Sequence, residues 1–362
     1  MPMDAQSFKP LLKTLVETPE YFTPNDLKLA LNHVFTPGLI PAEQIGAFLT
    51  ALHLQRVERR PESLAAAAAV LRERALKAEV LDPGNDFVVD IVGTGGDGYN
   101  LFNVSTAAAI VAAGAGARVV KHGSRASTSI SGAADILEAL GCPFTKPTPG
   151  IVNPIQRMPF WFILAPHYHH ALAYLAPYRK ALPFRTMFNI LGPLINPAFP
   201  HGMVLGITEP ELGLTFAHSL LEAGMKRALV VCGQERIDEI SCAGPTYAWE
   251  LNDGEITEKK LHPAMFGLET HPLTKVTGGS PVENADILRR LVTSGKDISE
   301  ELKPMLDFVL INTSALLVVA GIAKDYHDGV RLSMESITSG KAWEAFETFK
   351  KASLSAQAAA SS

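Results

Sequence analysis

Cysteine is scarce in this 362-residue chain, and a surplus of positive charge is absent. The three cysteines, Cys142, Cys232 and Cys242, form no CxxC pair, which argues against a disulfide scaffold and is typical of a reducing compartment. Lysine and arginine number 32 against 37 acidic residues, so the net charge is −5. Proteins that bind nucleic acid or an anionic membrane usually have the opposite balance, so neither partner is expected.

Long apolar runs are lacking as well. The longest, from Ala107 to Ala117, is too short and too rich in glycine and alanine to span a bilayer. The first twenty residues hold no apolar core of signal-peptide length. What is present is an ordinary globular composition, 47% apolar and 19% charged, over a length that suggests two domains. We therefore expect a cytoplasmic protein with a sizeable core.

The first 80 residues are predicted to be helical, because their apolar residues recur at helical spacing. Thr23 is placed to cap the second helix, with Asp26 three residues later in the manner of a capping box. Further helices are predicted over 41–54 and 62–80. No strand is expected in this part of the chain.

From residue 81 onward, short apolar strands alternate with helices. The predicted strands are 87–92, 118–120, 161–165, 203–207 and 227–232. The helices between the first of these strands are 105–116 and 131–140. This alternation favours an α/β domain with a mainly parallel central sheet. The last residues, 353–362, are mostly serine and alanine and are expected to form a disordered tail.

A glycine-rich loop follows the first predicted strand. Its sequence is GTGGDG over 93–98, and the residues NVST, 103–106, open the next helix. Glycines let backbone N–H groups approach an anion closely, and a helix N-terminus adds partial positive charge. The spacing is neither a Walker loop nor GxGxxG. It favours a phosphate-binding loop over a plain turn before a capped helix.

A second polar segment, KHGSRASTS over 121–129, is predicted to follow a strand in the same way. Two cations, an imidazole and four hydroxyls around one glycine suit a ligand that carries several phosphates. A solvated polar loop is the alternative reading of the residues alone.

Two adjacent acids, Asp238 and Glu239, follow the strand that ends near Cys232. In a loop, both carboxylates can reach a divalent cation, and Mg²⁺ typically takes one or two carboxylates together with water and substrate phosphates. Without further context, a solvated acidic pair is the alternative.

A cluster of histidines and arginines comes from the middle of the chain. Three histidines within four residues could indicate a zinc site: His167, His169 and His170. No cysteine or acid stands at a ligand spacing from them, so a metal is not favoured here. Arg179 can pair with a carboxylate through two hydrogen bonds, or it can be an ordinary arginine on a helix surface.

Together these segments resemble the anthranilate phosphoribosyltransferases. The motifs that carry the resemblance occur in family order between Asp90 and Ala285: DIVGTGGDG, NVST, KHGSRASTS, SGAADILEALG, APHYHHA, RTMFNILGPLINP, DEISCAGPT and GGSPVENA. The helical start also fits the family, and the STS after KHGSRA is similar to eukaryotic, especially fungal, members. Several motifs in one order are far more specific than any single one.

The resemblance implies a small all-helical domain, residues 1–80 joined by part of 165–195, and a larger α/β phosphoribosyl-binding domain over 81–362. The active site would lie in the hinge cleft, and members are usually homodimers. The implied reaction moves the 5-phosphoribosyl group from phosphoribosyl pyrophosphate (PRPP) to the amine of anthranilate. Its products would be N-(5-phosphoribosyl)anthranilate and pyrophosphate, in tryptophan biosynthesis.

The resemblance also implies roles for individual residues. PRPP would be held by Gly93, Gly96, Asp97, Asn103, Val104, Ser105, Thr106, Lys121, His122, Gly123, Ser124, Arg125, Ala126, Ser127, Thr128 and Ser129. The anthranilate-binding site would be lined by Gly93, His122, Ser124, His169 and Arg179. Two Mg²⁺ ions would be held by Ser105, Asp238 and Glu239. No residue is implied as an essential acid or base, and Lys121 would stabilise the charge of the leaving group.

Three positions depart from the family pattern. Leu101 stands where a threonine is usual, Ser124 replaces an asparagine that contacts anthranilate, and Ala133 replaces a serine. Each leaves one contact of the family in question.

Two other functions remain open. A pyrimidine nucleoside phosphorylase of the same fold would have a different sequence in the glycine loop. It would also leave the DE and RTMFNILGP strings harder to explain. A non-catalytic nucleic-acid-binding relative would need a basic surface, which the net charge of −5 opposes.

Overall fold

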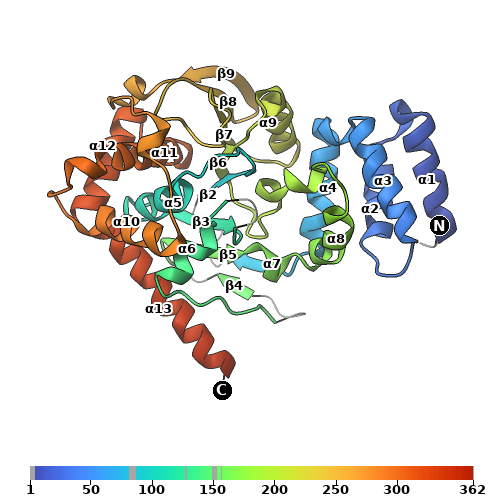
Figure 1. The fold of residues 1–362 in the computed structure, drawn as a ribbon, viewed down its shortest axis with the longest axis horizontal. Helices are drawn as coiled ribbons and strands as arrows, with labels where there is room; N and C mark the ends of the chain where they lie inside the picture. Colours follow the sequence, from blue (N-terminus) through green and yellow to red (C-terminus); the bar gives the residue numbers. More distant parts are fainter. Residues whose placement is uncertain (1–4, 81–86, 127–128, 149–152, 156, 362) are drawn as a thin grey trace.

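Four helices open the chain and pack around one apolar core. The computed structural model describes all residues except 1–4, 81–86, 127–128, 149–152, 156 and 362. The helices are α1 (Ala5–Glu17), α2 (Pro24–Val34), α3 (Ala42–Leu54) and α4 (Pro61–Arg74). Later in the chain, α8 (His170–Lys180) packs against α3 and α4 and places Leu175 in the same core. Figure 1 shows these helices together at one side of the molecule.

The predicted cap of α2 is confirmed. The amide of Asp26 donates to the Thr23 hydroxyl at 3.1 Å, and the Asp26 carboxylate accepts from the Thr23 amide at 2.9 Å. This reciprocal pair satisfies two backbone groups that a helix start otherwise leaves without a partner.

The predicted helix over 62–80 is too long, and the expectation of no strand before residue 80 was wrong. Helix α4 ends at Arg74, and Ala78–Val80 form β1, which pairs in parallel with β4 (Asn153–Ile155). Ala75 has extended backbone, and the next amide, of Leu76, donates to the Tyr168 carbonyl. Tertiary pairing therefore overrides the helix preference of the local sequence.

A seven-stranded sheet forms the centre of the α/β domain, in the order β5-β3-β2-β6-β7-β8-β9. Five strands are parallel: β5 (Phe160–Leu164), β3 (Arg118–Gly123), β2 (Val88–Gly93), β6 (Gly202–Gly206) and β7 (Arg227–Gly233). The antiparallel strands β8 (Thr246–Asn252) and β9 (Glu255–Leu261) extend one edge. The fold class, a small helical domain and a larger α/β domain with a mainly parallel sheet, is confirmed, although the β8–β9 hairpin was not predicted.

The two faces of the sheet belong to different cores. Alternate side chains of a strand point to opposite faces. Val204 and Leu229 lie in the core formed with α5 and α11, whereas Met203, Leu205 and Val230 lie in the core shared with the helical domain. The sheet therefore connects the two domains directly.

Helices cover both faces of the sheet. They are α5 (Val104–Gly114), α6 (Ala133–Ala139), α7 (Ala165–Tyr168), α9 (Gly213–Glu222), α10 (Pro281–Thr293), α11 (Lys303–Ala320), α12 (Tyr326–Thr338) and α13 (Lys341–Ser361). Short 3₁₀ turns are η1 (Pro19–Tyr21), η2 (Val57–Arg59), η3 (Met187–Asn189), η4 (Gly192–Ile195), η5 (Pro210–Leu212), η6 (Pro263–Phe266), η7 (Leu273–Lys275) and η8 (Glu300–Leu302). Helix α9 packs against α4, across the boundary between the domains.

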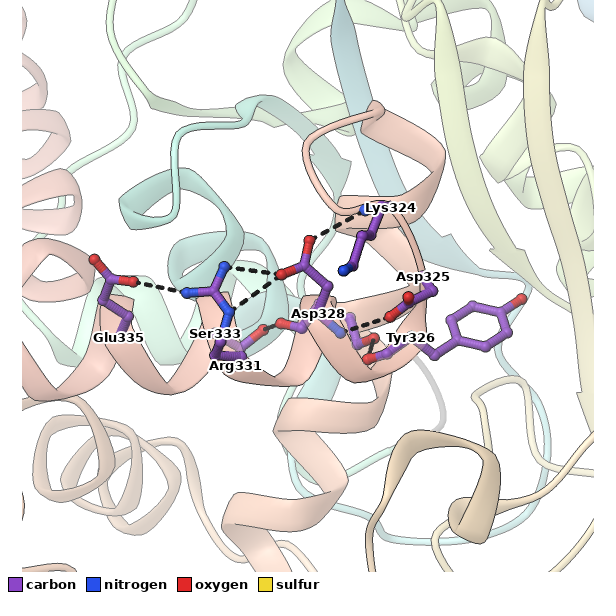
Figure 2. Close-up of polar contacts among 9 residues, drawn as sticks. Lys324, Asp325, Tyr326, Asp328, Arg331, Ser333 and Glu335 are labelled. Atoms are coloured by element: carbon purple, nitrogen blue, oxygen red, sulfur yellow. Dashed lines mark hydrogen bonds and ion pairs between the residues drawn. The ribbon is translucent and has the colours of Figure 1, made fainter.

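Helix α12 begins at an ordered network of charges (Figure 2). Asp325 caps it by accepting from the Asp328 amide at 2.8 Å, and the Asp328 carboxylate accepts from the Lys324 backbone amide and from the Arg331 guanidinium. Arg331 also contacts Glu335 one turn later at 3.3 Å. The cap orders the start of the helix, whereas exposed pairs of this kind add little stability.

The expectation of a disordered tail over 353–362 was wrong for the residues that the structure describes. Helix α13 continues to Ser361 and projects from the body at the C-terminus (Figure 1). Its earlier turns bury Phe346 and Phe349 in the core, so the helix is already nucleated when it reaches the exposed end. Alanine has the highest helix propensity, which extends the helix beyond its packed part.

One stretch, Glu300–Ala320, is long and apolar enough by composition to cross a membrane, with a mean hydropathy of 1.6. It is 83% buried inside the protein. Its helix α11 packs against α5, β2 and β6, which is the position of a core helix.

Candidate functional site

The carboxyl ends of the central strands open onto a cavity of about 790 Å³. The glycine loop after β2, the start of α5, the end of β3 and the acidic loop after β7 line it. Arg179 and Arg185 reach it from the segment that begins in α8. In parallel sheets, ligands bind at this edge, where loops from separate strands meet.

The fold brings most of the predicted site residues to this cavity. Those that line it are Gly93, Gly96, Asp97, Asn103, Ser105, Lys121, His122, Gly123, Ser124, Arg125, Ala126, Ser129, Arg179, Asp238 and Glu239. Val104, Thr106 and His169 are buried and do not line it. Ser127 and Thr128 lie outside the described residues. Two of the positions that depart from the family pattern, Leu101 and Ala133, also face the cavity.

The glycine loop is held by the acidic loop beneath it. The Gly95 amide donates to Asp238 Oδ2 at 2.7 Å, and the Gly95 carbonyl accepts from Arg185 at 3.0 Å. A Cβ at Gly93 or at Gly206 would overlap Asp238. The acidic loop can therefore lie against β2 and β6 only because both strands present bare backbone there.

Arg185 belongs to the cavity, and the sequence analysis did not assign it. Its guanidinium lies against Gly96, so that a Cβ at that glycine would collide with it. The preceding residue, Phe184, stacks on the His53 ring of α3 with a centroid distance of 4.6 Å and an interplanar angle of 20°. Arg185 thus connects the helical domain with the glycine loop. The only signal in the sequence was its place in the RTMFN string.

The segment 121–129 begins inside the sheet, which corrects the expectation that all of it forms a loop. Residues 121–123 belong to β3 and pair with β5, because the backbone stays extended until Gly123. Lys121 is consequently 1% exposed, and its ammonium donates to the Ile91 carbonyl and to the Ser105 hydroxyl. Burial lowers the pKa of Lys121, and the carboxylates of Asp90 and Glu239 act in the opposite direction.

The acidic residues at the cavity repel one another. Burial raises the pKa of Asp238 to about 6, and the negative charge of Asp97 adds to the rise. Burial and the adjacent Asp238 carboxylate hold the pKa of Glu239 well above its ordinary value. Such a set of carboxylate oxygens, with the Ser105 hydroxyl nearby, fits a hard divalent cation that would relieve the repulsion.

Among the described residues, no group of three or more His, Cys, Asp or Glu side chains is placed to hold a metal ion. A cation at the acidic loop would therefore take further ligands from hydroxyls, water or a bound phosphate, which is the usual coordination of Mg²⁺.

Asn103 ties the start of α5 to a distant helix. Its side chain donates to the Ser131 carbonyl and accepts from Asn284, both at 2.9 Å. Asn284 in turn accepts from the Gly279 amide at 2.8 Å. The asparagine predicted to touch PRPP thus has a structural role as well, and Asn284, which the sequence analysis missed, orients it.

His122, which lines the cavity, forms a pair of neutral histidines with the buried His169. The Nε2 atoms of His122 and His169 are 3.2 Å apart, so one ring donates and the other accepts. Burial lowers the pKa of His169 to about 4 and that of His122 well below its ordinary value, and the neighbouring His169 ring lowers the pKa of His122 further. Both rings are therefore uncharged near neutral pH.

Arg179, near the end of α8, lines the same cavity. Its Nε is buried and has no hydrogen-bond partner in the described part of the chain, and its guanidinium lies over the Phe188 ring at 5.8 Å. Burial lowers the pKa of Arg179 without a compensating acid. A guanidinium in this state retains donors for an anionic ligand.

Comparison with known families identifies the class first. A model described as "Glycosyl transferase family, helical bundle domain" matches residues 9–75, and one described as "Glycosyl transferase family, a/b domain" matches 85–343. These two parts coincide with the helical and α/β domains described above. The chain is therefore a glycosyl transferase of this two-part class.

Individual relatives narrow the class. The anthranilate phosphoribosyltransferase of Schizosaccharomyces pombe is 43% identical over 88% of this chain and 90% of its own length. That of Polynucleobacter necessarius is 40% identical over 93% and 96%. The Saccharomyces cerevisiae enzyme, solved with PRPP and Mg, has a TM-score of 0.87 at 33% identity over 98% of this chain and all of the other. The chain belongs to the anthranilate phosphoribosyltransferase family, which confirms the resemblance.

The buried histidine pair predicts a loss of stability in acid. The pKa of His169 is about 4 when folded and 6.5 in its ordinary state, so the unfolded chain takes up the proton first as the pH falls. The neutral ring makes its full contribution to stability above pH 6.5, and this contribution is lost progressively as the pH falls toward 4. Burial raises the pKa of Asp90 to about 6, so this carboxyl group has the opposite effect and favours the folded state as the pH falls below 6.

A comparison of His169→Gln with the parent chain separates the contribution of the His169 ring to the pH dependence of stability from that of buried carboxyl groups such as Asp90. We expect the drop in unfolding free energy between pH 7 and pH 5 to be smaller in the variant by roughly 1–2 kcal/mol. Urea titrations at the two pH values measure this. Parallel pH profiles for the two proteins would contradict a neutral buried ring.

Proposed function

We propose that this chain transfers the 5-phosphoribosyl group of PRPP to the amine of anthranilate, giving N-(5-phosphoribosyl)anthranilate and pyrophosphate. The observation that carries the proposal is the meeting of a glycine loop, a buried lysine and an acidic pair at one cavity. The S. cerevisiae relative has been solved with PRPP and Mg and with 4-fluoroanthranilate, which supports both substrate classes.

The glycine loop and the start of α5 are proposed to hold the phosphates of PRPP. Gly95 and Gly96 have positive φ angles of 69° and 83°, a conformation that turns successive backbone amides toward a common concave side. The N-terminus of α5 adds amides without intrahelical partners. Residues 121–126 and Ser129 would complete the cradle from β3 and the segment after it.

Ser105, Asp238 and Glu239 are proposed to hold two Mg²⁺ ions. The fit rests on their oxygen donors and on the crowding that raises the pKa of both carboxyls. When bound, the metal supplies positive charge to the pyrophosphate that departs. Lys121 adds its own positive charge from within β3, where hydrogen bonds to the Ile91 carbonyl and the Ser105 hydroxyl orient its ammonium group.

The acceptor is proposed to lie near Gly93, His122, Ser124 and Arg179. Arg179 would pair with the carboxylate of anthranilate, because its guanidinium is held against Phe188 but has no acid as a partner among the described residues. His169 lies behind His122 and would orient that ring rather than touch the substrate.

The chain's residues would act by position and charge rather than by moving an essential proton. Carbon one of the ribose gains positive character as its bond to pyrophosphate breaks, as in other glycosyl transfers. The histidines at the acceptor end are neutral and share a hydrogen bond, so they are poor proton donors. Alignment of the aromatic amine with the breaking bond is then the second large contribution, after stabilisation of the leaving group.

A homodimer and a cytoplasmic location are further parts of the proposal. Val16, Tyr21, Leu29 and Leu54 are large apolar side chains that the helical domain leaves 49–72% exposed, which suits a contact with a second copy. The three cysteines are free and buried, as in a reducing compartment. The helical domain is proposed to comprise α1 to α4 together with α8.

Product formation tests the proposed function directly. Purified protein with PRPP, anthranilate and Mg²⁺ should yield fluorescent N-(5-phosphoribosyl)anthranilate, whereas thymidine with phosphate should yield no free base. Asp238→Asn with Glu239→Gln should lower turnover by about 100-fold or more, because charge stabilisation at the leaving group is lost. Both replacements keep size and shape and remove repulsion, so thermal stability without Mg²⁺ should not fall.

Glu211→Gln is the matched control, since Glu211 is an exposed acid on η5 and outside the cavity. It should leave turnover unchanged. Full activity of the double variant in saturating Mg²⁺ would contradict the metal assignment, and phosphorolysis of thymidine would contradict the proposed reaction.

The acceptor assignment predicts an order of effects. Arg179→Ala should cost about 2–5 kcal/mol in kcat/KM for anthranilate, roughly tens- to thousands-fold, because a desolvated carboxylate loses its partner. Ser124→Ala should cost about 1 kcal/mol, the value of one hydrogen bond. Steady-state kinetics on the two variants decide the matter. A larger effect at Ser124, or equal rates with aniline, would rule out Arg179 as the main contact.

A further inference from the structure

A second, smaller cavity lies between the two domains, away from the site described above. It has a volume of about 170 Å³ and shares no lining residue with the larger cavity. Ala68 of α4 lines one side, and Leu220 and Met225, in and after α9, line another. Leu194 and Met203 complete largely apolar walls.

The charged groups at this cavity are cationic. Arg72 of α4 and Lys226, just before β7, both line it, and none of the described residues that line it is acidic. The guanidinium of Arg72 makes one long hydrogen bond, to the Leu194 carbonyl at 3.4 Å. Its Nε is buried with no partner in the described part of the chain. Burial lowers the pKa of Arg72, and no carboxylate opposes that effect.

A histidine at the same cavity offers a neutral donor. His201 Nδ1 accepts from the Val88 amide at 3.2 Å, so the uncharged ring carries its proton on Nε2. Burial and the positive charge of Lys226 lower the pKa of His201 and keep the ring uncharged. The residues that line the cavity therefore include one poorly solvated cation, Arg72, and one additional N–H donor, His201.

A strained residue covers the cation. Phe199 has a φ angle of 49°, in the left-handed region that aromatic residues rarely adopt, and Pro197 and Pro200 stand close on either side of it in the chain. Its ring centroid lies 5.3 Å from the Arg72 guanidinium carbon, and the residue is 58% exposed. Backbone strain of this kind is concentrated at ligand clamps and active sites, where the surrounding structure enforces it.

We propose that this cavity binds a small aromatic monocarboxylate, with the carboxylate on Arg72 and the ring between α4 and α9. A cavity of about 150 Å³ with apolar walls accommodates a benzene ring, so the volume suits one ring. The planar guanidinium matches a carboxylate through paired hydrogen bonds. Because α4 and α9 belong to different domains, the ligand would contact both. This site goes beyond the proposed reaction and does not depend on it.

Benzoate is the probe, since it has no amine and cannot accept a phosphoribosyl group. Because benzoate could also pair with Arg179, the titrations use the Arg179→Ala protein as background. We expect calorimetry to show one benzoate site there, with benzamide at least tenfold weaker because it lacks the charge. Adding Arg72→Gln should weaken benzoate binding at least tenfold, whereas turnover of Arg72→Gln in an otherwise unchanged chain should stay within about twofold.

Two further variants keep the test decisive. Arg74→Gln is the matched control, because Arg74 lies on the same helix but donates to Asn32 at 3.0 and 3.2 Å outside the cavity. It should leave benzoate binding unchanged. Met225→Trp should fill the cavity from its rim and abolish binding while Arg72 remains. The proposal is overturned if the background protein binds no benzoate, if benzamide binds equally well, or if either cavity variant retains full affinity.

Discussion

The candidate site depends on one close contact, the packing of the Asp238 loop on the bare backbone of two neighbouring strands. Gly93 ends β2 and Gly206 ends β6, and a Cβ on either would overlap Asp238. The contact lets Asp238 accept the Gly95 amide at 2.7 Å, so the acidic pair and the glycine loop hold one another in place. Asp97, Lys121 and Arg185, which also line the cavity, act electrostatically on the acidic pair.

The electrostatics of the site follow from that contact. Two adjacent acids at a buried position repel each other, and Lys121, a buried cation that acts on Glu239, is itself poorly solvated within β3. Buried charges are costly unless they are paired, and here the pairing is shared among Lys121, Asp90 and the acidic loop. Under the proposed function, Mg²⁺ together with the phosphates of PRPP would complete this pairing, and the residues would stabilise charge rather than transfer a proton. Arg185 adds a link from the helical domain to the same loop.

Patterns local in sequence could be predicted, and contacts between distant segments could not. The parallel strands were visible as short β-branched runs, and the capping box at Thr23 followed from residue spacing. Arg185 and Asn284 could not be assigned a place, because each acts through a loop that only the fold brings near. Strand β1 was missed because its pairing partner lies far along the chain. The helical end of α13 was missed because an alanine-rich sequence is consistent with both a tail and a helix.

Calorimetric titration of PRPP and Mg²⁺ into Gly206→Ala tests the central contact most directly. The added methyl group must displace the backbone of Asp238 from β6 and with it the support of the glycine loop. Gly202→Ala is the control on the same strand, where the atoms nearest to an added methyl group belong to the side chains of Phe87 and Val319. The account predicts that both variants lose stability but that Gly206→Ala alone loses PRPP affinity, by about 100-fold or more, equivalent to roughly 3 kcal/mol. Equal affinities in the two variants would contradict it.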